Sequence, residues 1–477
     1  MLRIRSIWPI SVLILCSALA SCGGNNQLGS QPQNGGNSSV VLAITDTPPS
    51  LVTILSAQVT LTGATLAPGN VSLFSGSTTV ELTRLQTDIA YIATAANIPA
   101  GNYTSVTLTF ANPSLTIEND SASTIAGCAV GSICPVVPTA TSLSTTVPLT
   151  SFSIASSSTA GLLIDINMEN LLSASLGEDF SAGTTVTPFT PGGIGAPPVG
   201  AEDVVGHVGN INATSKTFTL TNATATYSLK VDNTSTFFQF PITGTCPAPG
   251  FACLQDNQIL SVDIGIKSDG SILARNLLFE DADSSDVEVE GIVTSTNAAS
   301  QQFNMVVLTI SSSGTGLVIG GQATVQYSTS LPTPFDIDFQ HIDNLQLSTS
   351  SFSSSFTGPA DLVAGQQVSV RRNSSSTSTL VADRVRLRSS RITATVQSVG
   401  APNIILGNLP SLFFGHGGVT LIQAQTSITP PTIYFEVGGS ISSSTNLLGE
   451  LVSVRGPLFN TGGTNRTLLA TKVVLQP

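Results

Sequence analysis

Two neighbouring runs, Gln367-Val368-Ser369-Val370-Arg371 and Thr379-Leu380-Val381-Ala382-Asp383-Arg384-Val385-Arg386, alternate apolar with polar side chains. This period of two predicts β-strands that bury one face. The pair recurs downstream as Leu451-Val452-Ser453-Val454-Arg455 and Thr467-Leu468-Leu469-Ala470-Thr471-Lys472-Val473-Val474, and upstream as Leu260-Ser261-Val262-Asp263 and Ser271-Ile272-Leu273-Ala274-Arg275-Asn276-Leu277-Leu278. The copies are too long for thin solenoid repeats, so each is predicted to be a domain of five or six short strands.

Further alternating runs precede these copies, and they predict an all-β chain. Residues 162–168 are the clearest example, because Leu162, Ile164, Ile166 and Met168 share one face while Asp165 points away. We expect an N-terminal β-sandwich at residues 40–180 and a Thr/Pro/Gly-rich linker at 181–201. Three small antiparallel β-barrels or sandwiches follow at 202–283, 284–390 and 391–477.

The composition excludes two classes of protein. Only 9% of the 477 residues are charged, while Ser and Thr make up about a quarter of the chain, so long helices with charged, solvent-exposed faces are not expected. The net charge of -12 would repel a phosphate backbone, so nucleic acid is not an expected partner.

The N-terminus carries an export signal. Arg3 and Arg5 precede a short apolar run that is too short to span a membrane, and the run ends at Leu19-Ala20-Ser21-Cys22. This ending resembles the bacterial lipobox, in which the cysteine is acylated and becomes the new N-terminus. The resemblance implies a signal peptide at residues 1–21 and lipid attachment at Cys22. Residues 22–39, rich in Gly, Asn, Gln and Ser, then form a tether from the outer membrane, with the periplasmic or surface side left open.

Four further cysteines form two local pairs, Cys128 with Cys134 and Cys246 with Cys253. Each pair lies in a Gly- and Pro-containing loop. An exported chain meets an oxidising compartment, so we expect two structural disulfides. A metal site is the alternative, but neither loop contains His, Asp or Glu.

Two resemblances cover most of the mature chain. The N-terminal region resembles a bacterial family known only as domain of unknown function 4382, through Thr45-Asp46 with Pro48, Val80-Glu81-Leu82, and the turn Pro99-Ala100-Gly101-Asn102-Tyr103. Similar turn-strand units occur in Ig-like and transthyretin-like sandwiches, which is the fold that the resemblance implies here. The three repeats are similar to domain of unknown function 5666, most closely at Gly365-Gln366-Gln367-Val368-Ser369-Val370. Neither family brings catalytic residues with it.

Two acidic segments are candidate metal sites. Asp281, Asp283 and Asp286 lie in a carboxylate-rich stretch between the first and second repeats, and Asp336 and Asp338 share one face of a predicted strand. Carboxylate oxygens of this kind could hold calcium, although acidic segments are commonly just solvated. We therefore expect no cofactor and keep Ca²⁺ as the alternative.

One strand face is basic. Arg384, Arg386 and Arg388 occupy alternate positions, which places three guanidinium groups side by side. They could bind an anionic ligand such as a phosphate or an acidic glycan. They could equally pair with the acidic segment of a neighbouring domain.

These observations predict a lipid-anchored envelope protein with a non-enzymatic role in binding, adhesion or scaffolding. The expected partners are the membrane, reached through the acyl chains, and an envelope glycan or protein. Tandem β modules on a tether suit reach and multivalent contact. The alternatives are a polysaccharide hydrolase, which would need two close carboxylates, and a purely structural assembly lipoprotein.

Overall fold

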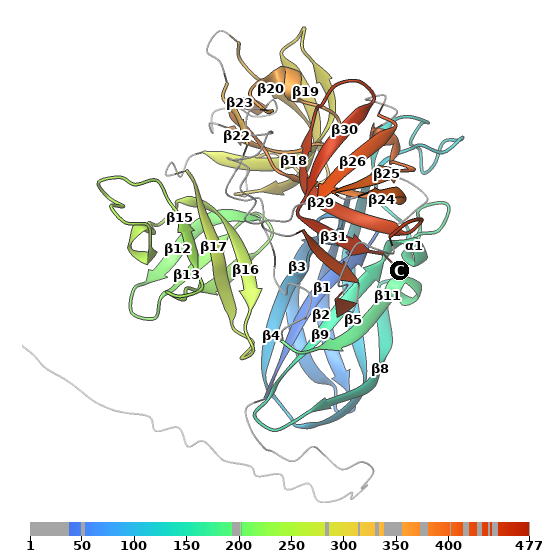
Figure 1. Ribbon diagram of the computed structural model, residues 1–477. Coiled ribbons are helices and arrows are strands. Elements are labelled where there is room, and N and C mark those ends of the chain that lie inside the picture. Colours follow the sequence, from blue (N-terminus) through green and yellow to red (C-terminus); the bar gives the residue numbers. More distant parts are fainter. Residues whose placement is uncertain are drawn as a thin grey trace, which may run out of the picture.

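The computed structural model describes residues 38–48, 53–192, 201, 203–281, 286–312, 315–329, 333–337, 355–372, 380–400, 402–413, 419–426, 432–436, 439–440 and 447–476. Its strands confirm the expected all-β, multi-domain fold (Figure 1). The N-terminal domain, in blue to teal, lies below the second and third repeats, and the first repeat, in green, lies beside it. Cys22 and the predicted signal and tether up to residue 37 lie outside the described residues.

The N-terminal domain is a sandwich of two sheets. One sheet has the strand order β11-β9-β1-β4, and the other has the order β3-β2-β5-β6 with β8 also paired to β5. Its strands are β1 (Ser38–Thr47), β2 (Thr53–Ala67), β3 (Val71–Glu81), β4 (Ala90–Ile98), β5 (Gly101–Glu118), β6 (Ile133–Val136), β7 (Ala140–Ser142), β8 (Ser144–Ile154), β9 (Thr159–Asn167), β10 (Glu178–Asp179) and β11 (Thr184–Phe189). Short helices η1 (Leu82–Gln86), α1 (Met168–Leu171) and α2 (Phe180–Gly183) connect them.

Strand β1 is buried on both faces. Val40, Leu42 and Ile44 point into the sandwich core, while Val41 on the opposite face packs into the core of the first repeat. The continuous apolar run of this strand therefore has a structural reason, because a second domain covers its outer face.

The sandwich extends further along the chain than the sequence predicts. Residues 184–189, which we assigned to the linker at 181–201, form β11 and pair antiparallel with β9. Val186 in this strand is buried in the sandwich core. The Thr/Pro composition suggested a linker, but threonine and valine also favour strands when a partner strand is available.

Each repeat is a closed barrel with one topology. In the first repeat the order is β12-β13-β14-β17-β16, closed by pairing of β16 with β12, and the third strand pairs in parallel with the fifth. The other two repeats follow the same order, with parallel pairs β20–β23 and β26–β30. This is the strand order of the OB-fold, a five-stranded Greek-key barrel.

The barrels also share an additional short strand that runs parallel to the final strand, namely β15, β21 and β27. The first barrel contains β12 (Val204–Asn212), β13 (Thr217–Thr221), β14 (Thr226–Lys230), β15 (Phe237–Gln239), η2 (Phe251–Cys253), β16 (Ile259–Ile266) and β17 (Ile272–Asp281). The second contains β18 (Val287–Asn297), β19 (Gln302–Ile310), β20 (Gln322–Gln326), β21 (Phe335–Ile337), η4 (Pro359–Asp361), β22 (Gln367–Arg372) and β23 (Leu380–Leu387). The third contains β24 (Ser389–Gly400), β25 (Asn403–Gly407), β26 (Leu421–Thr426), β27 (Ile433–Glu436), β28 (Gly439–Ser440), β29 (Leu451–Phe459), β30 (Asn465–Ala470) and β31 (Lys472–Leu475).

In the first and second barrels the first strand passes close to its neighbour at one equivalent position. A Cβ atom added to Gly291 would lie 2.4 Å from the carbonyl oxygen of Val306, and one added to Gly206 would lie 2.7 Å from that of Thr221. The third barrel has Ala394 at the matching place in the sequence. Close backbone approach therefore explains the glycine in the first two copies.

The domains share apolar contacts instead of standing apart. The core of the second barrel includes Phe459 and Leu469 from the third. A separate cluster joins Leu55 of the sandwich, Val306 of the second barrel and Leu412 of the third. The sequence left the arrangement of the domains open, and in the described residues the domains pack against one another. Among these residues, no helix has the length and apolar character needed to cross a bilayer.

Candidate functional site

Charged side chains from all four domains meet between the domains. We call this group the interdomain ion cluster, and its members are Arg84, Asp88, Asp203, Glu280, Glu288, Glu290, Arg386, Arg388, Arg391, Arg455 and Lys472. In a chain with only 9% charged residues, so many buried charges in one place require mutual compensation.

Asp88 is the centre of one half of the cluster. It follows η1 in the sandwich and is 6% exposed. Its carboxylate accepts hydrogen bonds from Arg391 Nη2 at 2.6 Å and Lys472 Nζ at 2.7 Å, and Arg455 Nη1 lies 3.5 Å away. Burial alone would raise the pKa of Asp88, but Lys472, Arg455 and Arg391 outweigh it and hold the pKa well below its usual value. All three cations belong to the third barrel, so their ion pairs with Asp88 link that barrel to the sandwich.

Arg84 and Asp203 extend these contacts to the other two barrels. Arg84, on η1 itself, donates to Glu290 of the second barrel at 3.0 Å and to the carbonyl oxygen of Asp203 at 2.9 Å. The Asp203 carboxylate also accepts a bond of 2.5 Å from Arg455. Asp203 lies at the start of the first barrel, so this group of side chains joins all four domains.

Arg388 is the centre of the other half of the cluster. It is 1% exposed and lies between Glu280, at 2.7 Å, and Glu290, at 3.2 Å. Arg386 pairs with the same Glu280. Nearby, Glu288 accepts a hydrogen bond from Ser369, and burial together with repulsion from Glu280 raises its pKa to about 8.

The predicted anion-binding arginines face carboxylates. Arg386 and Arg388 bind Glu280, and Arg384 donates to Asp336 at 2.6 Å. For Arg386 and Arg388 the structure thus shows the alternative that the sequence left open, which is pairing with the acidic segment of the preceding repeat. Arg384 instead pairs with a carboxylate of its own barrel.

The predicted metal ligands are paired in the same way. Asp281 and Asp286 both face Arg371, at the junction of the first and second barrels. Asp336 faces Arg384 and Arg386, while Asp283 and Asp338 lie outside the described residues. Across the described part of the chain, no group of three His, Cys, Asp or Glu side chains could hold a metal ion.

Sequence reasoning missed the half of the cluster around Asp88. Arg455 and Lys472 stand in strands whose other residues are largely buried, and both side chains are fully or almost fully buried. An isolated charge inside an otherwise apolar strand is the signal that could have identified them, because such a charge needs a partner.

A second set of buried carboxyl groups lies in the sandwich. Burial raises the pKa of Glu81 to about 7, although Ser56 and Thr83 donate hydrogen bonds to it. Burial also raises the pKa of Asp46, with repulsion from Asp165 and Glu81 adding to the effect. Asp46 and Glu81 belong to two of the three motifs that carry the resemblance of this domain, so these two motifs place buried carboxyl groups near each other in the sandwich.

A cavity of about 390 Å³ lies beside the cluster, between the sandwich and the second and third barrels. Apolar side chains line part of it, including Leu55, Ile292 and Leu412. Hydroxyl and amide side chains line much of the rest, namely Thr53, Thr83, Gln86, Gln367, Ser390, Thr393, Thr395 and Asn408. The charged residues among the described lining are Arg84, Arg391 and Asp120.

Strand β24 forms one wall of this cavity, because its side chains alternate between the barrel core and the cavity. Arg391, Thr393 and Thr395 point outward into the cavity, while Ile392, Ala394 and Val396 are buried in the barrel core. Thr393 donates a hydrogen bond of 3.2 Å to Gln86 of the sandwich. This cavity could not be predicted from the sequence, because its lining residues come from three domains.

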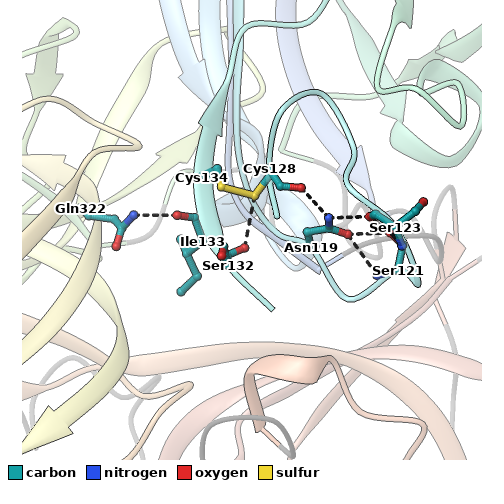
Figure 2. Close-up of a disulfide and its surroundings, with 8 residues drawn as sticks. All are labelled: Asn119, Ser121, Ser123, Cys128, Ser132, Ile133, Cys134 and Gln322. Carbon is teal, nitrogen blue, oxygen red and sulfur yellow. Dashed lines mark hydrogen bonds between the residues drawn. A yellow bond between two sulfur atoms is a disulfide. The ribbon is translucent and has the colours of Figure 1, made fainter. Parts of the chain in front are cut away.

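Both expected disulfides are present. Cys128 is bonded to Cys134 and Cys246 to Cys253, with Cα atoms 5.7 and 5.0 Å apart. Figure 2 shows the first of them, where Gln322 of the second barrel donates a hydrogen bond of 2.8 Å to the carbonyl oxygen of Ile133, next to Cys134. This disulfide therefore lies directly beside an interdomain contact.

Residues 37–181 match the model of a family described as Domain of unknown function (DUF4382). The match confirms the predicted resemblance of the N-terminal domain and covers the sandwich up to α2. A search of curated proteins found no match.

Proposed function

We propose that this chain is an exported lipoprotein, anchored to the bacterial outer membrane through acyl chains on Cys22, with a non-enzymatic role in binding, adhesion or scaffolding in the envelope. The N-terminal run that ends at Cys22 supports the anchor. The two disulfides support an oxidising compartment. We also propose that the three barrels are copies of domain of unknown function 5666.

The observation that carries this proposal is the interdomain ion cluster. It joins four β domains into one body and pairs the buried charges of its own members with one another. A hydrolase of glycosidic bonds needs two carboxyl groups that flank the scissile bond, whereas Asp120 is the single carboxylate among the described lining residues of the cavity. A rigid body on a membrane tether suits binding or scaffolding better than hydrolysis.

Acyl labelling in cells tests the anchor. Cells fed an alkyne-labelled fatty acid should incorporate the label into the wild-type chain, which should fractionate with the outer membrane. The Cys22→Ala variant should lose both properties, and a Cys16→Ala variant should keep both, because Cys16 lies within the predicted signal. An unlabelled wild-type chain released as free protein would contradict the anchor.

A second assay tests the non-enzymatic role. Purified protein incubated with isolated envelope polysaccharide should release no reducing ends above a buffer control. A release that the Asp120→Asn variant abolishes would make the chain a hydrolase and overturn this part of the proposal.

A further inference from the structure

We propose that the cavity between the sandwich and the second and third barrels is a binding site for an uncharged saccharide of one or two rings. This inference rests on the proposed envelope function and specifies the partner. The volume of about 390 Å³ lies at the lower end of the range of about 300–1,000 Å³ for small-molecule pockets. Interfaces between domains are common places for such pockets.

The lining combines the two surfaces that a sugar ring needs. Ile54, Ile292 and Pro410, which are only partly buried, offer an apolar surface against which the C–H face of a ring could pack. Gln86 and Asn408 offer amide groups, and the threonines of β24 offer hydroxyl groups. Amides and hydroxyls both donate and accept hydrogen bonds, as the hydroxyl groups of a sugar also do.

Two of these amides keep unused hydrogen-bonding capacity within the described residues. Gln86 accepts a bond from Thr393 through Oε1, and its Nε2 group forms no bond there. Asn408 donates a weak bond of 3.5 Å to Thr395 Oγ1, while its Oδ1 atom accepts none. Asn408 is exposed, which places an available acceptor where a ligand would enter.

The charges in the lining favour a neutral ligand over an acidic one. Arg391 donates to Asp88 through Nε and Nη2 and to Gln367 through Nη1. Arg84 pairs with Glu290. An anion would have to displace a buried carboxylate from either guanidinium, which leaves that carboxylate unpaired at a large cost. A neutral sugar leaves these pairs intact.

The first barrel supplies a matched control for the test. Asn210 has φ of 49°, and its Nδ2 donates to Thr219 Oγ1 at 3.2 Å. Asn408 has φ of 51° and makes the same kind of bond to Thr395. Both asparagines are exposed and bond to a threonine of a neighbouring strand, although Asn210 lies within β12 and Asn408 follows β25. The Asn210 pair does not line the cavity.

The experiment uses the full acylated chain in lipid nanodiscs, with cellobiose, maltose and N,N′-diacetylchitobiose as neutral probes and digalacturonate as the acidic probe. Isothermal titration calorimetry should show one-to-one binding of at least one neutral probe. Asn408→Ala should weaken this binding about five- to tenfold, since it removes one hydrogen bond, and Thr395→Phe should abolish it by filling the cavity. Asn210→Ala and Thr219→Phe should leave the affinity unchanged.

Three results would overturn the inference. They are the absence of neutral-probe binding up to 10 mM, a preference for digalacturonate, and equal losses in the cavity variants and their controls. Circular dichroism verifies that each variant is folded, and an unfolded Thr395→Phe leaves Asn408→Ala as the deciding variant. A chain that is acylated and sorted to the outer membrane but binds no saccharide would refute this inference alone. An unacylated, released chain would refute the proposed function, and the titrations would still report on the cavity.

Discussion

Substitution of Asp88 by asparagine should uncouple the third barrel from the sandwich. Asp88 is the shared acceptor for Arg391 and Lys472, and Arg455 completes the group. The asparagine side chain has nearly the same shape but no charge, so the three cations lose their common counter-ion.

The size of the expected stability loss follows from the burial of the three cations. The side chains of Arg391, Arg455 and Lys472 are 5%, 0% and 2% exposed, so solvent cannot replace the missing carboxylate. Removal of one partner from a buried pair costs about 3–5 kcal/mol, and Asp88 serves three cations, so we expect a loss of at least this size. The control is Asp232→Asn, because Asp232 forms a half-exposed pair of 3.8 Å with Lys267. An asparagine oxygen can still accept the hydrogen bonds that Thr234 donates to Asp232. This control should leave stability unchanged within error, since exposed pairs contribute little.

Denaturant unfolding of the full chain, followed by circular dichroism, measures this loss. A double variant, Asp88→Asn with Lys472→Met, should lose less than the sum of the two single losses, because the second change removes one of the uncompensated cations. A loss below about 1 kcal/mol for Asp88→Asn, or strict additivity in the double variant, would refute the reasoning.

Three further predictions address the rest of the molecule. The melting temperature should fall between pH 5 and pH 9, because burial raises the pKa of Glu81 to about 7 and burial and repulsion from Glu280 raise that of Glu288 to about 8. The stability that these carboxyl groups add when protonated is complete below their ordinary value of 4.5 and is lost as the pH rises through 7 to 8. Calorimetry of Glu288→Gln should show a flatter profile, and an unchanged profile would contradict the assignment. Replacement of Cys128 and Cys134 by serine should cost roughly 2 kcal/mol by loop entropy, and hydrogen exchange should increase at Ile133, where Gln322 docks. Gly291→Ala should cost about 1–3 kcal/mol in chemical unfolding, because its Cβ would lie 2.4 Å from a carbonyl oxygen, whereas Ala394→Gly at the matching position should cost no more than about 1 kcal/mol.

Local pattern predicted the strands well, because alternation is a property of neighbouring residues. Leu162, Ile164, Ile166 and Met168 are all buried in the sandwich core, as their spacing indicates. The pattern could not show that Val41 packs under the first barrel, since that contact joins distant parts of the chain. Residues 184–189 were wrongly assigned to the linker, because their composition suits either a linker or a strand. Only the pairing of this segment with β9 decides between the two.

The pairing of the charged residues could likewise be predicted only in part. The sequence placed Arg384, Arg386 and Arg388 on one face and left open their pairing with an acidic segment of a neighbouring domain. The structure shows this pairing at Glu280 for Arg386 and Arg388, while Arg384 pairs with Asp336 of its own barrel. It could not pair Asp88 with Lys472, because 384 positions separate them. Such pairs depend on how whole domains pack, which short-range patterns do not encode.

Small-angle X-ray scattering of the full chain tests most directly whether the four domains form one body. A single compact body of 477 residues should have a radius of gyration of about 23 Å. Four domains joined end to end would give a value of roughly 40 Å. A value near 22–25 Å is the predicted result, and a value above about 35 Å would contradict the packing of the domains around the interdomain ion cluster.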